Sequence, residues 1–151
     1  MLKLNDKAPE FTLQDQDGNT HNLSDYLGRR VLLYFYPKDD TPGCTTEACN
    51  FRDGYKDFQD MGLVVLGVST DSVKSHRKFS DKYALPFPLL SDETHEVCEK
   101  YGVWGKKKFM GREYLGSTRS SFLIDEKGML IKIYDQVKPA DHAEEVKRDI
   151  A

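Results

Sequence analysis

The chain has 151 residues, of which 38% are hydrophobic and 31% charged, and its formal net charge at pH 7 is −3. This length fits one domain whose core is large enough to fold without a metal or a disulfide. The balanced charges argue against general nucleic-acid binding, and no apolar run approaches the ~20 residues of a membrane span. The first residues, Met-Leu-Lys-Leu-Asn-Asp, have neither the apolar centre of a signal peptide nor the composition of a transit peptide. We therefore expect residues 1–151 to form one cytoplasmic domain with no membrane or nucleic-acid partner.

The first half of the chain is expected to alternate strands with helices. Asp17-Gly18-Asn19 is a strong hairpin turn, and continuous apolar runs predict strands that are buried on both faces. Ser24 can cap a single helical turn that ends at Gly28. In chain order we predict strands at 11–13 and 20–23, the helical turn, a strand at 31–36, a helix from 41 to about 61, a strand at 63–68 and a helix at 72–83.

The second half is expected to complete an α/β fold. We predict a short helix at 93–101, a loop at 105–117, where no clear period is present, and an antiparallel pair of strands at 121–124 and 130–134. Asp141 and Glu144 form a capping pair for a last helix. The order βαβα, then ββα, is that of a thioredoxin fold with an N-terminal β-hairpin extension, in which helices flank a central mixed sheet.

The start of the helix expected after residue 40 has the chemistry of a redox site. Thr41 is a good N-cap and Pro42 suits the first helical position, which makes Cys44 the third helical residue. Unpaired backbone N–H groups and the positive end of the helix dipole favour an anion there. Cys44 should therefore ionise more easily than a free thiol, and the thiolate is the reactive form.

A second cysteine, Cys49, follows on another side of the same predicted helix. Five helical residues separate the Cα atoms of Cys44 and Cys49 by about 8.7 Å, whereas a disulfide needs less than about 7 Å. The two can react with each other only if the first helical turns unwind, which suits a redox pair that changes shape as it cycles. The third cysteine, Cys98, falls in a short amphipathic helix and is interpreted as structural.

These residues and several other segments resemble the peroxiredoxins. Pro37, Thr41 and Cys44 match the family pattern Pro-x-x-x-Thr-x-x-Cys, and Gly-Cys-Thr-x-x-x-Cys at 43–49 is similar to the bacterioferritin comigratory protein, or peroxiredoxin Q, subgroup. The similarity includes Ala-Pro-Glu-Phe-Thr-Leu at 8–13, Phe-Pro-Leu-Leu-Ser-Asp at 87–92, Tyr-Gly-Val-Trp-Gly at 101–105 and Arg-Ser-Ser-Phe-Leu-Ile-Asp at 119–125. It covers almost the whole chain.

The resemblance implies a thiol-dependent peroxidase that uses no cofactor or metal. In this interpretation the Cys44 thiolate attacks a peroxide and becomes a sulfenic acid, Cys49 resolves it as an intrachain disulfide, and thioredoxin or a similar thiol protein reduces that disulfide. Arg119 is the family's active-site arginine, and Thr41 offers its hydroxyl to the departing oxygen. Pro37 shapes the turn and shields the thiolate from water. An intrachain pair needs no neighbouring subunit, so we expect a monomer.

Three other interpretations use the same cysteines. A thioredoxin-type disulfide oxidoreductase should have Cys-x-x-Cys and a proline before the third main strand, whereas this chain has four residues between Cys44 and Cys49 and an arginine, Arg119, in that region. A zinc module could combine the two cysteines with His95 and Cys98, although a domain of this size does not need the metal. A redox sensor would share the chemistry but would not turn over.

Overall fold

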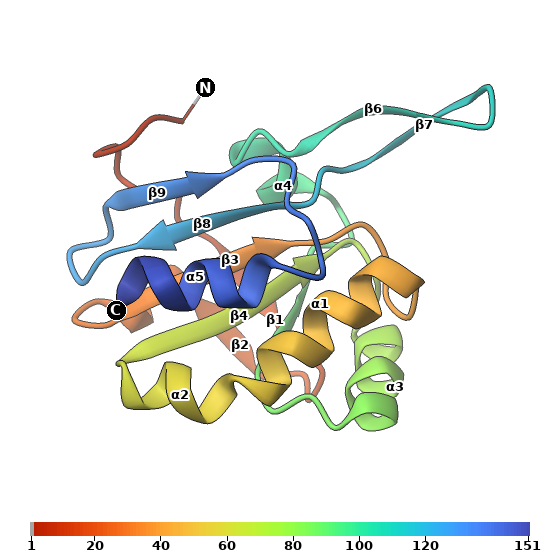
Figure 1. Ribbon diagram of the computed structural model, residues 1–151. Coiled ribbons are helices and arrows are strands. Elements are labelled where there is room, and N and C mark those ends of the chain that lie inside the picture. The colour runs from red at the N-terminus through yellow and green to blue at the C-terminus, as the bar shows by residue number, and fades with distance from the viewer. Residues whose placement is uncertain (1) are drawn as a thin grey trace.

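A seven-stranded mixed sheet forms the centre of the molecule in the computed structural model, which describes residues 2–151 (Figure 1). Its strand order is β2-β1-β5-β4-β3-β8-β9. The strands are β1 (Thr12–Gln14), β2 (Thr20–Asn22), β3 (Arg30–Phe35), β4 (Leu63–Ser69), β5 (Leu89–Ser91), β8 (Ser120–Ile124) and β9 (Leu130–Tyr134). The helices are η1 (Leu23–Tyr26), α1 (Pro42–Asp53), α2 (Tyr55–Asp60), α3 (Val73–Tyr83), α4 (Glu96–Lys100) and α5 (His142–Ile150).

The pairing of the strands confirms the expected fold. β3, β4 and β5 run parallel to one another, while β8 pairs antiparallel with both β3 and β9. The predicted hairpin of β1 and β2 joins this sheet through an antiparallel pairing of Gln14 with Ser91 in β5. The result is a mixed α/β sheet with the βαβα–ββα order of a thioredoxin fold and the expected N-terminal hairpin extension.

Alternating side chains of β3 divide the core into two clusters. Leu32, Tyr34 and the following Tyr36 belong to one cluster, and Leu33 and Phe35 belong to the other. Helices α1, α2 and α5 cover the sheet face of the first cluster, and α4 covers the face of the second (Figure 1). Residues 31–35 of β3 are all buried because helices cover both faces, which explains the unbroken apolar run of β3 in the sequence. Any residue in one cluster is therefore separated by the sheet from residues in the other.

The helix predicted from 41 to about 61 is divided in two. α1 ends at Asp53 and α2 begins at Tyr55. Gly54 lies between them, where its N–H donates to the Asn50 carbonyl and its own carbonyl accepts from Phe58 N–H. The apolar spacing continues through Phe51 and Phe58 into one cluster, so the sequence pattern does not reveal the break.

The loop predicted at 105–117 is wrong. These residues form a second, two-stranded sheet of β6 (Trp104–Phe109) and β7 (Arg112–Ser117), which projects from the body in Figure 1. Met110 and Gly111 make the turn with φ values of 52° and 78°, the left-handed pair that a tight hairpin requires. Tyr114 and Leu115 are exposed on β7, so the hairpin lacks the apolar alternation by which a half-buried strand is recognised.

Capping differs from prediction at two short elements. η1 begins after Asn22, whose backbone N–H and side-chain amide both donate to the Asp25 carboxylate, so Ser24 lies inside the turn rather than capping it. α5 does follow Asp141, but the side chain of that residue makes no cap hydrogen bond. Within residues 2–151, no helix is long and apolar enough to cross a lipid bilayer.

Candidate active site

The carboxyl end of β3 leads directly into the segment that carries Cys44. Residues 37–41 form a loop, Thr41 takes the extended N-cap conformation (φ −102°, ψ 156°), and Pro42 begins α1. Cys44 is the third residue of the helix, as predicted, and only 1% of its surface is exposed. Its thiol therefore lies within the first turn, at the positive end of the helix dipole.

Arg119 lies directly against this thiol. It occupies the junction between β7 and β8, 75 residues along the chain from Cys44, and its Nη2 donates to the Cys44 Sγ at 3.3 Å. Burial alone would lower the pKa of the guanidinium, but the neighbouring Glu47 and Cys44 raise that pKa above its usual value. Arg119 therefore presents a fixed positive charge to the sulfur atom.

Glu47 completes the arrangement and was not identified from the sequence. Its Oε1 accepts from Arg119 Nη1 at 2.8 Å, and only 1% of its side chain is exposed. Its other oxygen, Oε2, is buried without a hydrogen-bond partner among the described residues. Burial outweighs the attraction of Arg119 and raises the pKa of Glu47 from 4.5 to about 7. The available signal was a carboxylate three residues after Cys44, on the inward face of a predicted helix.

Thr41 occupies the N-cap but does not cap the helix with its side chain. Its hydroxyl instead donates to the Lys38 carbonyl oxygen at 2.9 Å, across the loop. The hydroxyl proton is therefore engaged, and the oxygen retains lone pairs that can accept a hydrogen bond. Pro37 stands exposed at the start of the same loop, two residues after the end of β3 at Phe35.

Cys49 lies further along α1, half-buried, and all three cysteines are free thiols. Because Cys44 and Cys49 both sit in intact helix, the separation argued from helical geometry applies to this state. Disulfide formation between them requires α1 to unwind locally.

The zinc interpretation is wrong because of where Cys98 lies. Cys98 belongs to the core cluster beneath α4, on the face of the sheet opposite Cys44. Burial, reinforced by the Asp92 carboxylate, raises the pKa of its thiol well above the usual range. The three side chains that could place metal-ligating atoms together in the described part of the chain are instead Asp39, Asp71 and His76, which are considered below.

A buried thiol at a helix start, in contact with an arginine that is itself paired with a buried carboxylate, is an arrangement suited to thiol-based redox catalysis. Comparison with known proteins gives the same class. The AhpC/TSA family matches residues 4–133. Peroxiredoxin Bcp of Bacillus subtilis is 50% identical over 144 residues, covering 95% of this chain and 92% of that protein. Peroxiredoxin Bcp of Escherichia coli K12 is 51% identical over 141 residues, covering 93% and 90%.

Solved structures agree with the sequence relatives. Peroxiredoxin Q of Xylella fastidiosa, in a cysteine-to-serine mutant, superposes with a TM-score of 0.94 at 36% identity and covers 99% of this chain and 96% of its own. The bacterioferritin comigratory protein of Xanthomonas campestris has a TM-score of 0.88 at 38% identity and covers 93% and 89%. The chain belongs to the AhpC/TSA family and, within it, to the Bcp or peroxiredoxin Q group. It is a thiol-dependent peroxidase.

Proposed function

We propose that Cys44 is the peroxidatic residue of this peroxidase. Its thiolate sulfur attacks one oxygen of a hydroperoxide, the O–O bond breaks, and Cys44 becomes a sulfenic acid while hydroxide or alkoxide leaves and takes up a proton. The observation that carries this proposal is the 3.3 Å contact between Arg119 Nη2 and Cys44 Sγ. No other cysteine in the part of the chain that the structure describes has an arginine donating to its sulfur.

Arg119 and Thr41 divide the work of binding the peroxide. Negative charge moves from sulfur to the departing oxygen during attack, and a guanidinium already aimed at the sulfur can stabilise both positions without reorganising. Thr41 was expected to donate its hydroxyl, but that proton is engaged by Lys38. We therefore assign Thr41 the role of accepting the hydroperoxide O–H, which orients the other oxygen toward the sulfur. Pro37 shapes the entrance to this site.

Cys49 resolves the sulfenic acid. Its sulfur attacks the Cys44 sulfur, water leaves, and an intrachain disulfide forms. A partner dithiol, such as thioredoxin, then reduces the disulfide in two exchange steps and becomes oxidised itself. Glu47 lies between the two cysteines on α1, so unwinding that brings them together also removes Glu47 from its buried position beside Arg119.

The substrates we assign are hydrogen peroxide and organic hydroperoxides. The Xanthomonas campestris relative is described by its alkyl peroxide reduction activity. An intrachain pair of cysteines requires no second subunit, so we also propose that residues 1–151 act as one domain, as a monomer and in the cytoplasm.

One experiment tests the assignment of the cysteines. The reduced protein is treated with one equivalent of hydrogen peroxide, and its thiols are mapped by intact mass and peptide mass. We expect rapid loss of two hydrogens with Cys44 linked to Cys49. Cys98→Ser, the matched control, should give the same product, and Cys49→Ser should stop at the sulfenic acid. Three surviving thiols, or a link to Cys98, would refute the assignment. Continued peroxide consumption with thioredoxin present distinguishes the enzyme from a sensor that is oxidised only once.

A further inference from the structure

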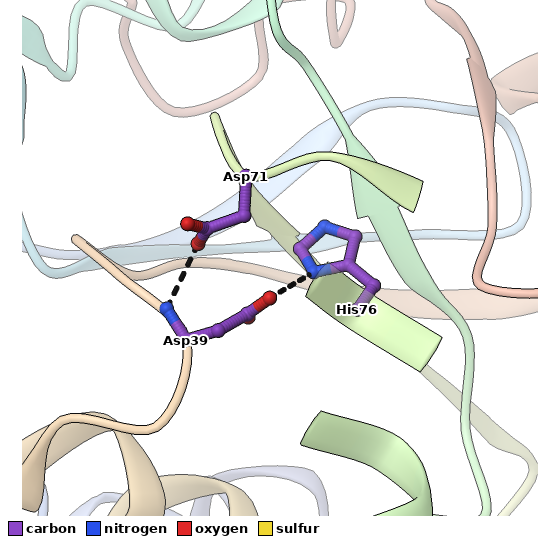
Figure 2. Close-up of side chains that lie close together, drawn as sticks. All are labelled: Asp39, Asp71 and His76. Atoms are coloured by element: carbon purple, nitrogen blue, oxygen red, sulfur yellow. Dashed lines mark hydrogen bonds and ion pairs between the residues drawn. The ribbon is translucent and has the colours of Figure 1, made fainter. Parts of the chain in front are cut away.

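A cluster of three side chains attaches the loop that precedes Cys44 to α3 and to the segment after β4. Asp39, in the middle of that loop, meets His76 from α3 and Asp71 from the end of β4 (Figure 2). We propose that Asp39 and His76 are positioning residues that fix the loop at 37–41 for the reaction at Cys44; this inference rests on the proposed function of Cys44 and Thr41. Neither residue is a fixed position of the Pro-x-x-x-Thr-x-x-Cys pattern at 37–44.

Hydrogen bonds hold both carboxylate oxygens and the backbone N–H of Asp39. Its Oδ1 accepts from the Tyr36 hydroxyl at 2.6 Å, and its Oδ2 accepts from the Ser75 hydroxyl at 2.8 Å and faces His76 Nδ1 at 2.7 Å. Its backbone N–H donates to Asp71 Oδ2 at 2.8 Å (Figure 2). Both backbone and side chain of this one loop residue are therefore fixed by their surroundings.

The protons of this cluster follow from its acceptors. His76 is fully buried, and its Nε2 lies 3.0 Å from the Leu90 carbonyl oxygen, which can only accept, so we assign a proton to Nε2. Its Nδ1 lies 2.7 Å from an Asp39 carboxylate oxygen, so one proton lies between these two atoms. His76 and Asp39 thus form a buried hydrogen-bonded pair. Burial and the Asp39 charge raise the pKa of Tyr36 well above its usual value, which keeps that hydroxyl a donor.

These contacts also indicate that the cluster holds the loop at 37–41 in place and does not serve as a metal site. Both ring nitrogens of His76 and both carboxylate oxygens of Asp39 already have protein partners. The adjacent Asp40 adds a second link to the same helix on the surface, accepting from Lys82 Nζ at 2.8 Å and from the Tyr83 hydroxyl at 2.6 Å. Two consecutive loop residues are therefore attached to α3.

The contacts of Asp39 influence the site at Cys44 through the carbonyl group of Lys38. Asp39 is bonded directly to Lys38, and the Lys38 carbonyl is the acceptor that orients the Thr41 hydroxyl. Fixing Asp39 therefore fixes the direction in which Thr41 presents its free lone pairs to a hydroperoxide. The same attachment leaves the chain anchored before Thr41 when the first turns of α1 unwind, so that the site can re-form in register after reduction.

The test compares three variants with the wild type in single-turnover oxidation of Cys44 by hydrogen peroxide. Asp39→Ala should lower the second-order rate constant by about 10- to 100-fold, the effect expected when a reacting group is displaced by about 1 Å. Asp39→Asn should recover most of that loss, because its amide can donate to His76 while its oxygen still accepts from Tyr36. Tyr36→Phe keeps the ring and removes one hydrogen bond, and should give an intermediate loss.

Asp92→Ala is the matched control. Asp92 is also buried, but its side chain accepts from the N–H groups of Val97 and Cys98 in α4 and from no residue of the loop at 37–41. It should lower the thermal midpoint without slowing Cys44 oxidation. Nitrogen NMR of the imidazole should show Nε2 of His76 protonated in both proteins, and a changed Nδ1 signal in Asp39→Asn, where an amide replaces the carboxylate.

Two results would overturn the inference. One is normal Cys44 oxidation in folded Asp39→Ala; the other is an equal loss of rate in Asp39→Ala and Asp92→Ala, which would mean that general stability is responsible. Failure of the wild type to react at Cys44 would instead overturn the proposed function, and this inference with it.

Discussion

Glu47→Gln should make the protein more stable at neutral and alkaline pH. Burial raises the pKa of Glu47 from 4.5 to about 7, so the folded protein binds a proton that the unfolded chain has lost between these values. The free energy of unfolding therefore falls as pH rises from 4.5 to about 7. Above pH 7 buried Glu47 is ionised and its destabilising effect is complete. At about 1.4 kcal/mol per pH unit, ionised Glu47 costs about 3 kcal/mol. Glutamine keeps the shape and an acceptor for Arg119 but cannot ionise.

The assay is urea denaturation of the reduced protein, followed by circular dichroism, at pH values from 4.5 to 8. The two proteins should have similar unfolding free energies at the acidic end, and Glu47→Gln should exceed the wild type by about 3 kcal/mol at pH 8. Asp57→Asn serves as the control, because that carboxylate is exposed and pairs with Lys147 on the surface. A difference that does not depend on pH, or a less stable Glu47→Gln at pH 8, would refute the reasoning.

Further predictions concern the charge, the core and the unwinding step. Arg119→Ala should slow Cys44 oxidation by about 100-fold or more in single-turnover kinetics, with a much smaller effect on the thermal midpoint. Tyr34→Phe should stabilise the protein by about 1 kcal/mol in denaturant titration, since the Tyr34 hydroxyl is buried without a partner among the described residues. Phe51→Ala should destabilise it by about 3–5 kcal/mol by the same measurement. Formation of the Cys44–Cys49 disulfide should accelerate less between pH 6 and 8 in Glu47→Gln than in the wild type, because ionised Glu47 favours the unwound form; stopped-flow quenching with mass analysis measures this.

Local rules predicted the start of the active-site helix well. The N-cap position of Thr41, the proline after it and the depth of Cys44 all follow from backbone geometry within a few residues. The same rules did not predict the direction of the Thr41 hydroxyl, because Lys38 competes for it through a loop conformation that no periodic pattern describes. Family resemblance supplied Arg119, since nothing local connects residues 75 positions apart.

The parts that were missed depend on tertiary contacts. Glu47 looked like an ordinary polar helix residue, and only the folded chain brings Arg119 to it. Asp39 and His76 are 37 residues apart. In the sequence, Asp39 looks like an ordinary acidic loop residue and His76 like an ordinary helical histidine. Among the described side chains of β6 and β7 only Ser117 is buried, so the signal used to recognise strands is missing from their sequence. Buried charge and unsupported strands are the two cases in which hydrophobic periodicity carries no information.

The break at Gly54 separates the part of the chain that must change shape from the part that must not. In the proposed mechanism α1, which carries both cysteines, loses helical turns in each cycle, whereas α2 packs against β4 in the centre of the sheet. In one continuous helix, disorder at one end can spread by loss of successive hydrogen bonds. A glycine between two short helices ends that cooperative unit. In this mechanism Gly54 confines the repeated melting to α1, and the core residues of the sheet and of α2 remain a template on which α1 reforms.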